Sequence, residues 1–255
     1  MDPLNCALQE GVETRRLTNK VDSTRTTEVS VEAPNRLLRD GVREELDEMF
    51  EKMPLSSDSV FLDVGCGQGP ALIRVAQFAP RLVVGVDINL GSLRAAKAAM
   101  KSVNQRPLLV QGDMANLPFK PEVFSHLCCR LSLPYVEQKS AIAEMGRVLR
   151  QGGVIFLQLH SVKFYVNLLF KELSSWKRLL ANTFCLLNGL VFQLSEKQLT
   201  IRRTTPYQEL YQTEKGVVRL LKRIQVEPMW IENRRQFRVA GVKTGKQNFH
   251  REVVR

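Results

Sequence analysis

Residues 60–70 read Val-Phe-Leu-Asp-Val-Gly-Cys-Gly-Gln-Gly-Pro, an apolar run that ends in three glycines spaced two apart. The pattern predicts a buried strand, a tight turn and the start of a helix. Gly65, Gly67 and Gly69 carry no Cβ, so the turn can adopt positive φ and approach a ligand closely. Pro70 suits the first helical position, where its missing N–H costs nothing. At the carboxyl end of a parallel strand, such a turn is where open α/β sheets bind nucleotide-like ligands.

Strand and helix patterns alternate along the following hundred residues. The short apolar runs predict strands at 60–64, 82–86, 108–111, 124–129 and 154–159. The helical spacings predict helices at 33–53, 71–78, 93–103 and 137–149, the last ended by Gly152-Gly153, and at 214–224, with Thr213 as its N-cap. Two final strands, 226–231 and 237–242, lie close enough in sequence to pair antiparallel. Such alternation favours a parallel sheet with helices on both faces.

The length of 255 residues and the composition bound the organisation and the setting. We expect a flexible polar tail at 1–30 and a single domain at 31–255, interrupted by an insertion at 161–212. The five cysteines have no metal-type spacing, so no metal site is expected. The sequence shows no signal peptide and no apolar run long enough to span a membrane, which predicts a cytoplasmic protein.

The net positive charge of the chain comes entirely from its last third. Residues 161–255 hold 18 Lys and Arg against 7 Asp and Glu, and this difference equals the whole net charge of +11. Such asymmetry indicates an acidic partner, namely nucleic acid, an anionic substrate or a membrane surface, or else a solvated basic face.

Two carboxylates follow the strands next to the glycine turn. A dinucleotide fingerprint needs Gly-x-Gly-x-x-Gly, and here the third glycine comes one residue early. At the end of the second strand, Asp87 can accept both hydroxyls of a ribose, and Ile88 offers an apolar face to a purine. After the third strand, Asp113 can accept from an adenine amine while the backbone at Met114 reads the ring edge. Singly, each aspartate is more often a cap or a turn former, but together the three strand ends favour a nucleoside-type cofactor.

At these motifs the chain resembles the class I S-adenosylmethionine-dependent methyltransferases, in the branch of the ubiquinone/menaquinone-biosynthesis methyltransferases. The resemblance covers roughly 33–160, and more loosely 213–244. The matching segments are Asp63-Val-Gly-Cys-Gly-Gln-Gly, Gly85-Val-Asp, Gly112-Asp-Met-Ala-Asn-Leu-Pro-Phe and Glu144-Met-Gly-Arg-Val-Leu-Arg-Gln-Gly-Gly. It implies an α/β, Rossmann-like, seven-stranded and mostly parallel sheet with an antiparallel last hairpin, and a helical insertion after the fifth strand. Ser125 departs from the pattern, since relatives often carry Asp there.

The resemblance also implies roles at the site. S-adenosylmethionine would be the cofactor and S-adenosylhomocysteine the product. Asp63 would fix the turn, and Asp87 and Asp113 would hold the ribose and the adenine. The other cofactor-binding positions would be Gly65, Cys66, Gly67, Ile88, Met114, Cys129 and Arg130.

Methyl transfer from a sulfonium mainly needs alignment, and a general base only where the acceptor must lose a proton. His160 and Tyr135 are weak candidates for such roles, because a structural histidine and a partly buried loop tyrosine are the commoner cases. His126 reads as a packing residue inside a strand. Residues 161–212 mix aromatic and basic side chains. This mixture is typical of an apolar pocket for an amphipathic or anionic small molecule, of a nucleic-acid-binding surface, or of an extra helical layer.

Three functions stay open on the sequence. The favoured one is methyl transfer to a small or lipid-like acceptor. The second is an RNA methyltransferase that uses the basic last third, although no Asn/Asp-Pro-Pro-Tyr/Phe signature follows the fourth strand. The third is a regulatory protein that binds S-adenosylmethionine without catalysis.

Overall fold

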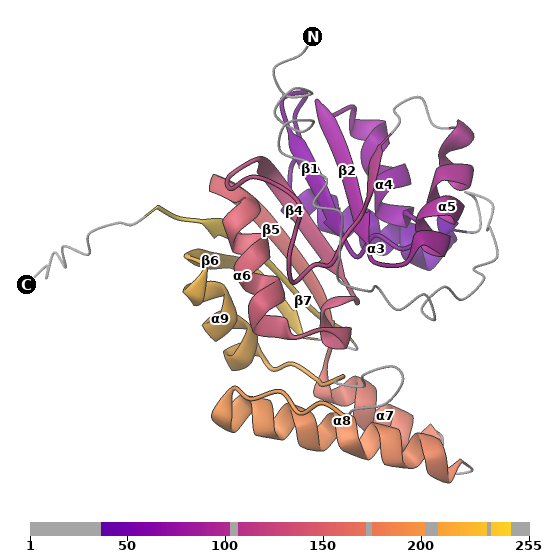
Figure 1. The fold of residues 1–255 in the computed structure, drawn as a ribbon, viewed down its shortest axis with the longest axis vertical. Coiled ribbons are helices and arrows are strands. Elements are labelled where there is room, and N and C mark those ends of the chain that lie inside the picture. Colours follow the sequence, from indigo (N-terminus) through magenta and orange to yellow (C-terminus); the bar gives the residue numbers. More distant parts are fainter. Residues whose placement is uncertain (1–36, 103–106, 172–174, 202–208, 234–235, 246–255) are drawn as a thin grey trace, which may run out of the picture.

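A computed structural model describes residues 37–102, 107–171, 175–201, 209–233 and 236–245. The predicted tail at 1–30 lies outside these residues. The described chain forms one seven-stranded sheet in the order β3-β2-β1-β4-β5-β7-β6 (Figure 1). Its strands are β1 Val60–Val64, β2 Leu82–Asp87, β3 Leu108–Gln111, β4 Phe124–Arg130, β5 Leu149–His160, β6 Val226–Asn233 and β7 Gln236–Lys243. β1 to β5 run parallel, and β7 is antiparallel to both β5 and β6, which confirms the predicted fold.

Helices cover both faces of the sheet (Figure 1). On one face pack α3 Asp40–Lys52, α4 Pro70–Val75 and α5 Leu90–Ala99, and on the other α6 Gln138–Val148 and α9 Glu214–Arg223. Short 3₁₀ turns follow at η2 Ala76–Phe78, η3 Met100–Ser102 and η4 Leu133–Tyr135. Successive strand residues enter opposite cores, as Phe61 and Leu62 do. This alternation explains why strands buried on both faces read as unbroken apolar runs.

Several helix boundaries differ from the prediction, and α5, for example, begins at Leu90 and not at 93. The first residues of the helix expected over 33–53 lie outside the described ranges. Leu37 is helical, Leu38 and Arg39 interrupt the helix, Arg39 with the extended ψ of 154°, and α3 then begins at Asp40. Gly152-Gly153 do not end α6, which stops at Val148, and the next strand starts at once with Leu149. The register between β4 and β5 shifts there, and Gly152 takes φ 71°. The two glycines therefore allow an irregular stretch at the start of β5. The predicted cap at Thr213 is confirmed, since its Oγ1 accepts from the Gly216 N–H at 3.1 Å.

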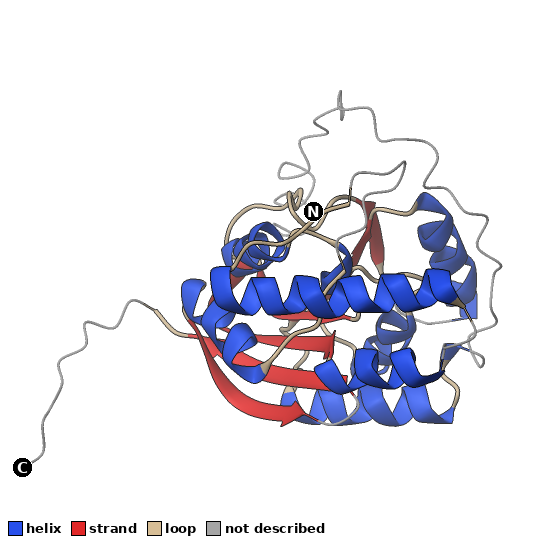
Figure 2. Cartoon of the chain, turned by 90° about the horizontal axis from the view of Figure 1, so that it is seen from below, coloured by secondary structure: helices blue, strands red, loops and turns tan. Residues whose placement is uncertain are grey.

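The insertion after β5 consists of two helices, α7 Val162–Lys171 and α8 Trp176–Ser195. In Figure 1 they lie at the lower end of the molecule, and in the view from below α8 is the long helix across it (Figure 2). The chain returns beside the point where it left: Ser161 and Gln212 form a parallel bridge, and the Gln212 N–H donates to the His160 carbonyl at 3.1 Å. None of the helices in the described ranges has the length and apolarity needed to cross a bilayer.

Candidate cofactor site at the carboxyl edge of the sheet

Asp87, at the tip of β2, is held by two backbone groups. Its Oδ2 accepts from the N–H of Gly67 at 2.8 Å, and its Oδ1 accepts from the N–H of Asn89 at 2.8 Å. Asn89 in turn caps α5, since its side chain accepts from the Ser92 N–H. An ionised carboxylate has about four acceptor positions, so each oxygen of Asp87 keeps capacity for a hydroxyl donor. The carboxylate is therefore oriented before any ligand arrives.

One side of the glycine turn is bound to strand β2, and the side at Gly67 is open. The N–H groups of Gly65 and Cys66 both donate to the Val86 carbonyl, at 2.8 and 3.0 Å, which joins the turn to β2. A Cβ on Gly65 would lie 2.3 Å from Ser132 Oγ, whereas a Cβ on Gly67 would meet nothing within 4 Å. Gly65 and Gly67 also take φ of 72° and 54°. This cradle fits a ligand that lies against the backbone at Gly67.

Three strand ends converge on Gly65. Besides Ser132, which follows β4, the same Cβ would meet Met114 Cε at 3.2 Å, from the loop after β3. Ser132 was missed on the sequence. Its hydroxyl donates to the Val64 carbonyl at 3.1 Å, and only the pairing of β4 with β1 brings the two together. A serine in a loop carries no pattern that predicts such a contact.

Asp113 and Ile88 line the outer part of this edge. Asp113 is exposed, and its Oδ1 accepts from the Ala115 N–H at 2.9 Å in a local turn. The Gly112 N–H donates to the Asp87 carbonyl at 3.1 Å, so the third strand end is fixed relative to the second. Ile88 is exposed beside them. The structure thus brings the two predicted aspartates to one edge.

Asp63 lies beneath the turn and not in the open cradle. It is buried, and its Oδ1 accepts from the Cys128 thiol at 3.2 Å. Burial raises the pKa of Asp63 from 3.8 to about 6, and the Cys128 hydrogen bond and the charge of Arg130 offset part of the rise. Asp63 is therefore in position to support the turn from below.

The cysteines beside the turn are packing groups. Burial raises the pKa of Cys66 well above its ordinary value and that of Cys129 to about 12, so both stay protonated at neutral pH. A thiol that stays protonated is a poor nucleophile. In the described part of the chain, no group of three or more His, Cys, Asp or Glu side chains is arranged to hold a metal ion.

Arg130, at the end of β4, is engaged by side chains that the sequence did not single out. Its Nε donates to Gln158 at 2.8 Å, and a terminal nitrogen lies 3.3 Å from the Glu45 carboxylate on α3. Gln158 also donates to Glu45, at 3.1 Å. The guanidinium therefore joins the sheet edge to α3, and it lies close enough to Asp63 to lower the pKa of that carboxyl.

His160 closes β5 inside an aromatic cluster. Its ring stacks on Phe164 at 4.2 Å between centroids and meets Tyr165 edge-on at 5.8 Å. Burial lowers the pKa of His160 from 6.5 to about 4, and its Nδ1 is buried without a hydrogen-bond partner. The Tyr165 hydroxyl donates to Glu209 at 2.5 Å, and Tyr135 is exposed. His126, by contrast, contacts Ser125 and the Pro54 carbonyl, which agrees with a packing role.

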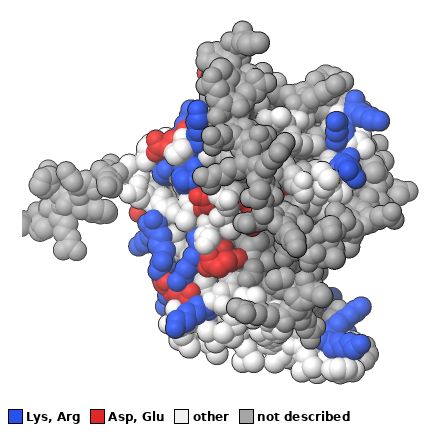
Figure 3. Space-filling model, in the orientation of Figure 1, with Lys and Arg blue, Asp and Glu red and all other residues white. Residues whose placement is uncertain are grey.

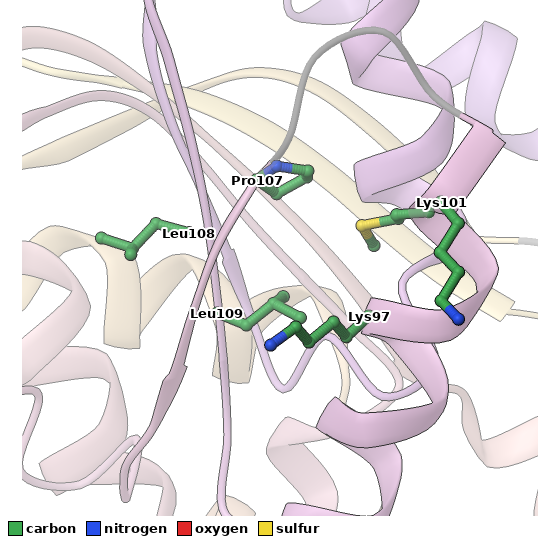
Figure 4. Close-up of a pocket in the computed structure, with 6 residues that line it drawn as sticks. Lys97, Lys101, Pro107, Leu108 and Leu109 are labelled. Carbon is green, nitrogen blue, oxygen red and sulfur yellow. The ribbon is translucent and has the colours of Figure 1, made fainter.

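Two hollows in the described part of the chain lie apart from the glycine turn. One of about 650 Å³ sits at the amino end of β3, between that strand and the end of α5 (Figure 4). It is lined by Lys97, Met100, Lys101, Pro107, Leu108 and Leu109. Asp113 follows the opposite end of β3, so this hollow is separate from the strand-end site. A second, of about 640 Å³, is lined by Tyr211 and by residues of α8, α9 and β6.

Comparison with known proteins identifies the matched part of the chain. Residues 62–157, from β1 to β5, match the family model of a methyltransferase domain. These residues form a class I S-adenosylmethionine-dependent methyltransferase domain. The methyltransferase domain thus contains the glycine turn, Asp87 and Asp113, and the open cradle at Gly67 fits the cofactor of its family.

Two curated relatives and one solved structure illustrate the likeness. The sterol 4-C-methyltransferase of Caenorhabditis elegans is 32% identical over 40% of this chain and 31% of its own length. The ubiquinone/menaquinone biosynthesis C-methyltransferase of Syntrophotalea carbinolica is 31% identical over 47% of this chain and 52% of its own. The magnesium protoporphyrin IX methyltransferase of Synechocystis PCC 6803, solved with bound S-adenosylhomocysteine, superposes with a TM-score of 0.56 at 18% identity, covering 86% of this chain and 90% of that one. The methyltransferase domain thus has the family's fold, while the chain spans a third to about half of those two curated relatives.

Proposed function

We propose that this protein transfers a methyl group from S-adenosylmethionine to a small, apolar, lipid-like acceptor. The use of S-adenosylmethionine is supported by one observation above all. The carboxylate of Asp87 is oriented by the backbone at Gly67 and Asn89, beside the open face of the turn. The aromatic cluster around His160, at the end of β5, supports an apolar, lipid-like acceptor.

Each predicted cofactor contact is part of this proposal. Asp87 accepts from the ribose hydroxyls and Asp113 from the adenine amine. The backbone at Gly67 faces the methionine portion, and Asp63 supports the turn from below. The remaining contacts come from Gly65, Cys66, Ile88, Met114, Cys129 and Arg130.

The acceptor is proposed to lie between the strand ends and the insertion, with residues 161–212 as its cover. The half-buried ring of Phe164 stacks on the buried ring of His160 and meets the buried ring of Tyr165 edge-on, and this aromatic packing is suited to an apolar ring or chain. The C. elegans relative is named for a sterol, and the S. carbinolica relative for ubiquinone and menaquinone biosynthesis. Both names support an apolar acceptor for this chain.

Methyl transfer mainly requires the protein to position the acceptor relative to the cofactor. The bound cofactor supplies an electrophilic methyl group on a sulfonium. Alignment of the acceptor with that methyl, in a site that excludes water, is worth about 7–11 kcal/mol. His160 is neutral at pH 7 and has a free Nδ1. It is therefore proposed to take the acceptor's proton where the acceptor is a hydroxyl or a carbon acid.

Several basic side chains of the last third are engaged in ion pairs. Arg219 and Arg223 contact Glu196, and Arg238 contacts Glu48 and Glu232. Lys243 is buried, and its ammonium donates to two backbone carbonyls. These pairings favour a small-molecule acceptor over RNA. The cytoplasmic location remains a prediction.

The test is a methyl-transfer assay with isotopically labelled S-adenosylmethionine and the purified full chain. Small-molecule, lipid and RNA fractions are offered separately, with Asp87→Ala as the inactive reference and the exposed Asp58→Ala as the matched control. Label in an apolar small molecule or lipid supports the proposal. Label in RNA would replace it with the RNA methyltransferase, and cofactor binding with no labelled product would indicate a non-catalytic protein.

A further inference from the structure

The outer face of α8 is apolar and exposed, while its inner face is partly polar and buried. Asn182, Asn188 and Gly189 lie on the buried side, next to Cys185 and Phe192. The outer stripe consists of Trp176, Leu180, Leu187, Leu190 and Leu194, which are 67%, 60%, 55%, 49% and 79% exposed. At 3.6 residues per turn these five positions fall within about 40° of one line along the helix. A surface helix ordinarily turns its apolar face to the core, and this one does the reverse.

The packing of the inner face holds α8 in this orientation. The Asn188 amide donates to the carbonyls of Leu199 and Glu209, at 3.0 and 3.1 Å, and accepts from the Leu199 N–H at 2.7 Å. A Cβ on Gly189 would lie 2.3 Å from the ring of Tyr211, so the helix approaches the returning chain as closely as only glycine allows. Rotating α8 to bury its leucines would break these contacts. The outer stripe is therefore left for something outside the described fold.

The two insertion helices carry positive charge alone. Lys163, Lys171, Lys177 and Arg178 are all exposed, and no Asp or Glu occurs within α7 or α8. The Lys177 ammonium lies 5.8 Å from the centroid of the Trp176 ring, at the edge of the stripe. In Figure 3 the lower rim of the molecule, where α7 and α8 lie, is largely white, with a group of Lys and Arg at its right-hand end. An apolar stripe is thus joined to a basic end.

We propose that the outer stripe of α8, with its basic end, docks on the surface of an anionic lipid bilayer. A helix that rests in the interface presents Trp, Phe and Leu to the acyl chains and Lys or Arg to the headgroups. Phe170, which is 73% exposed at the end of α7, adds an apolar side chain near the same basic residues. Large exposed apolar patches on a protein mark such contacts.

A second copy of the chain is the rival occupant. A two-fold interface places the same surface on both partners, so these two helices would face their own copies. Neither helix holds an acidic residue to neutralise Lys163, Lys171 and Lys177. Phospholipid headgroups with net negative charge supply that complement. The charge pattern therefore favours a bilayer.

This docking goes beyond the proposed methyl transfer and does not depend on it. α7 follows directly from β5, so a bilayer on α8 would lie beside the carboxyl edge of the sheet. A lipid-like acceptor would then have a short route to the site. The test below measures binding and needs no turnover.

The experiment is co-sedimentation of the full chain with vesicles of phosphatidylcholine alone, or with added phosphatidylserine. The wild type is expected to sediment with the anionic vesicles, and the Leu187→Glu/Leu194→Glu variant to stay in solution. Ser57→Glu/Gln77→Glu adds the same charge at exposed positions outside the insertion, and is expected to bind like the wild type. Circular dichroism and calorimetric titration with S-adenosylmethionine establish that each variant is folded.

Charge and depth are tested separately. Each of Lys171→Gln and Lys177→Gln is expected to weaken binding to anionic vesicles about fivefold. Trp176 fluorescence is expected to shift to shorter wavelength on those vesicles, and Trp230→Phe isolates its signal. Equal binding by Leu187→Glu/Leu194→Glu, or no binding by the wild type, overturns the proposal. So does a dimer in sedimentation velocity that the stripe variant dissociates while vesicle binding is absent.

Discussion

The backbone N–H of Gly67 donates to the carboxylate of Asp87 at 2.8 Å, and so joins the glycine turn after β1 to the tip of β2. The same carboxylate is the proposed acceptor for the cofactor's ribose. The turn and the ribose contact therefore share one anchor, and a change at Asp87 affects both.

Asp87→Asn is expected to weaken S-adenosylmethionine binding about 10- to 100-fold, since hydrogen bonds to a charged group contribute about 1.5–3 kcal/mol. An amide in place of the carboxylate also turns a donor toward the N–H of Gly67 or Asn89. Isothermal titration calorimetry measures the change, with Asp58→Asn as the control. Unchanged affinity would remove Asp87 from the site.

Gly65→Ala and Gly67→Ala are expected to fail in different ways. The new methyl at position 65 would overlap Ser132, 2.3 Å away, so the free energy of unfolding is expected to fall by about 1–3 kcal/mol. At position 67 the methyl meets no atom of the described residues within 4 Å but occupies the open face of the cradle, so cofactor affinity is expected to fall with about 1 kcal/mol lost in stability. Urea denaturation and titration calorimetry on both variants separate the two effects. The same profile for both variants would contradict the geometry.

Asp63 and His160 are expected to change the free energy of unfolding in opposite directions as pH rises. The buried Asp63 keeps its proton up to about pH 6, whereas the unfolded chain loses it near 3.8. The native state thus binds more protons in that window, and the free energy of unfolding falls as pH rises. Asp63→Asn removes this fall, so relative to the wild type it is expected to gain up to about 3 kcal/mol between about pH 4 and pH 7. Urea denaturation across that range measures the gain, and a pH-independent difference would contradict it.

His160 contributes the opposite slope. Its pKa is lowered to about 4 in the fold, against 6.5 when unfolded, so the unfolded state binds more protons between these values. Its contribution to stability is present above about pH 6.5 and is lost as pH falls toward 4. His160→Phe keeps a ring on Phe164 and is expected to flatten this loss, by up to about 3 kcal/mol. Denaturation at the same pH values as for Asp63→Asn provides the check.

The same His160→Phe variant tests the proposed base. Methyl transfer is expected to slow about 10²- to 10⁴-fold while cofactor affinity stays unchanged. A variant that transfers methyl at the wild-type rate would leave His160 as a packing residue in the aromatic cluster.

Local sequence patterns predicted the elements that are buried on both sides and missed what depends on tertiary context. Val60–Val64, whose five residues are all buried, was predicted with its observed bounds, because an apolar run between turns has few alternatives. α8 was expected only as part of a helical insertion and without bounds, because the apolar-aromatic stretch does not show where one helix ends and the next begins. Asp87 and Asp113 were found as strand-end carboxylates. Ser132 and Glu45 were not, because the pairing of β4 with β1 brings Ser132 to the turn and the packing of α3 brings Glu45 to Arg130.

The bridge between Ser161 and Gln212 places the departure and the return of the insertion side by side. Such a base makes residues 162–211 an exchangeable cassette. The cassette also packs on the sheet, since Phe192 and Leu210 belong to the core shared with α6 and α9. Changes in length and sequence between the two fixed points can therefore accumulate in the cassette while these two positions stay apolar. A chimaera that grafts another cassette between Ser161 and Gln212, and keeps apolar residues at both core positions, should fold around an unchanged cofactor edge.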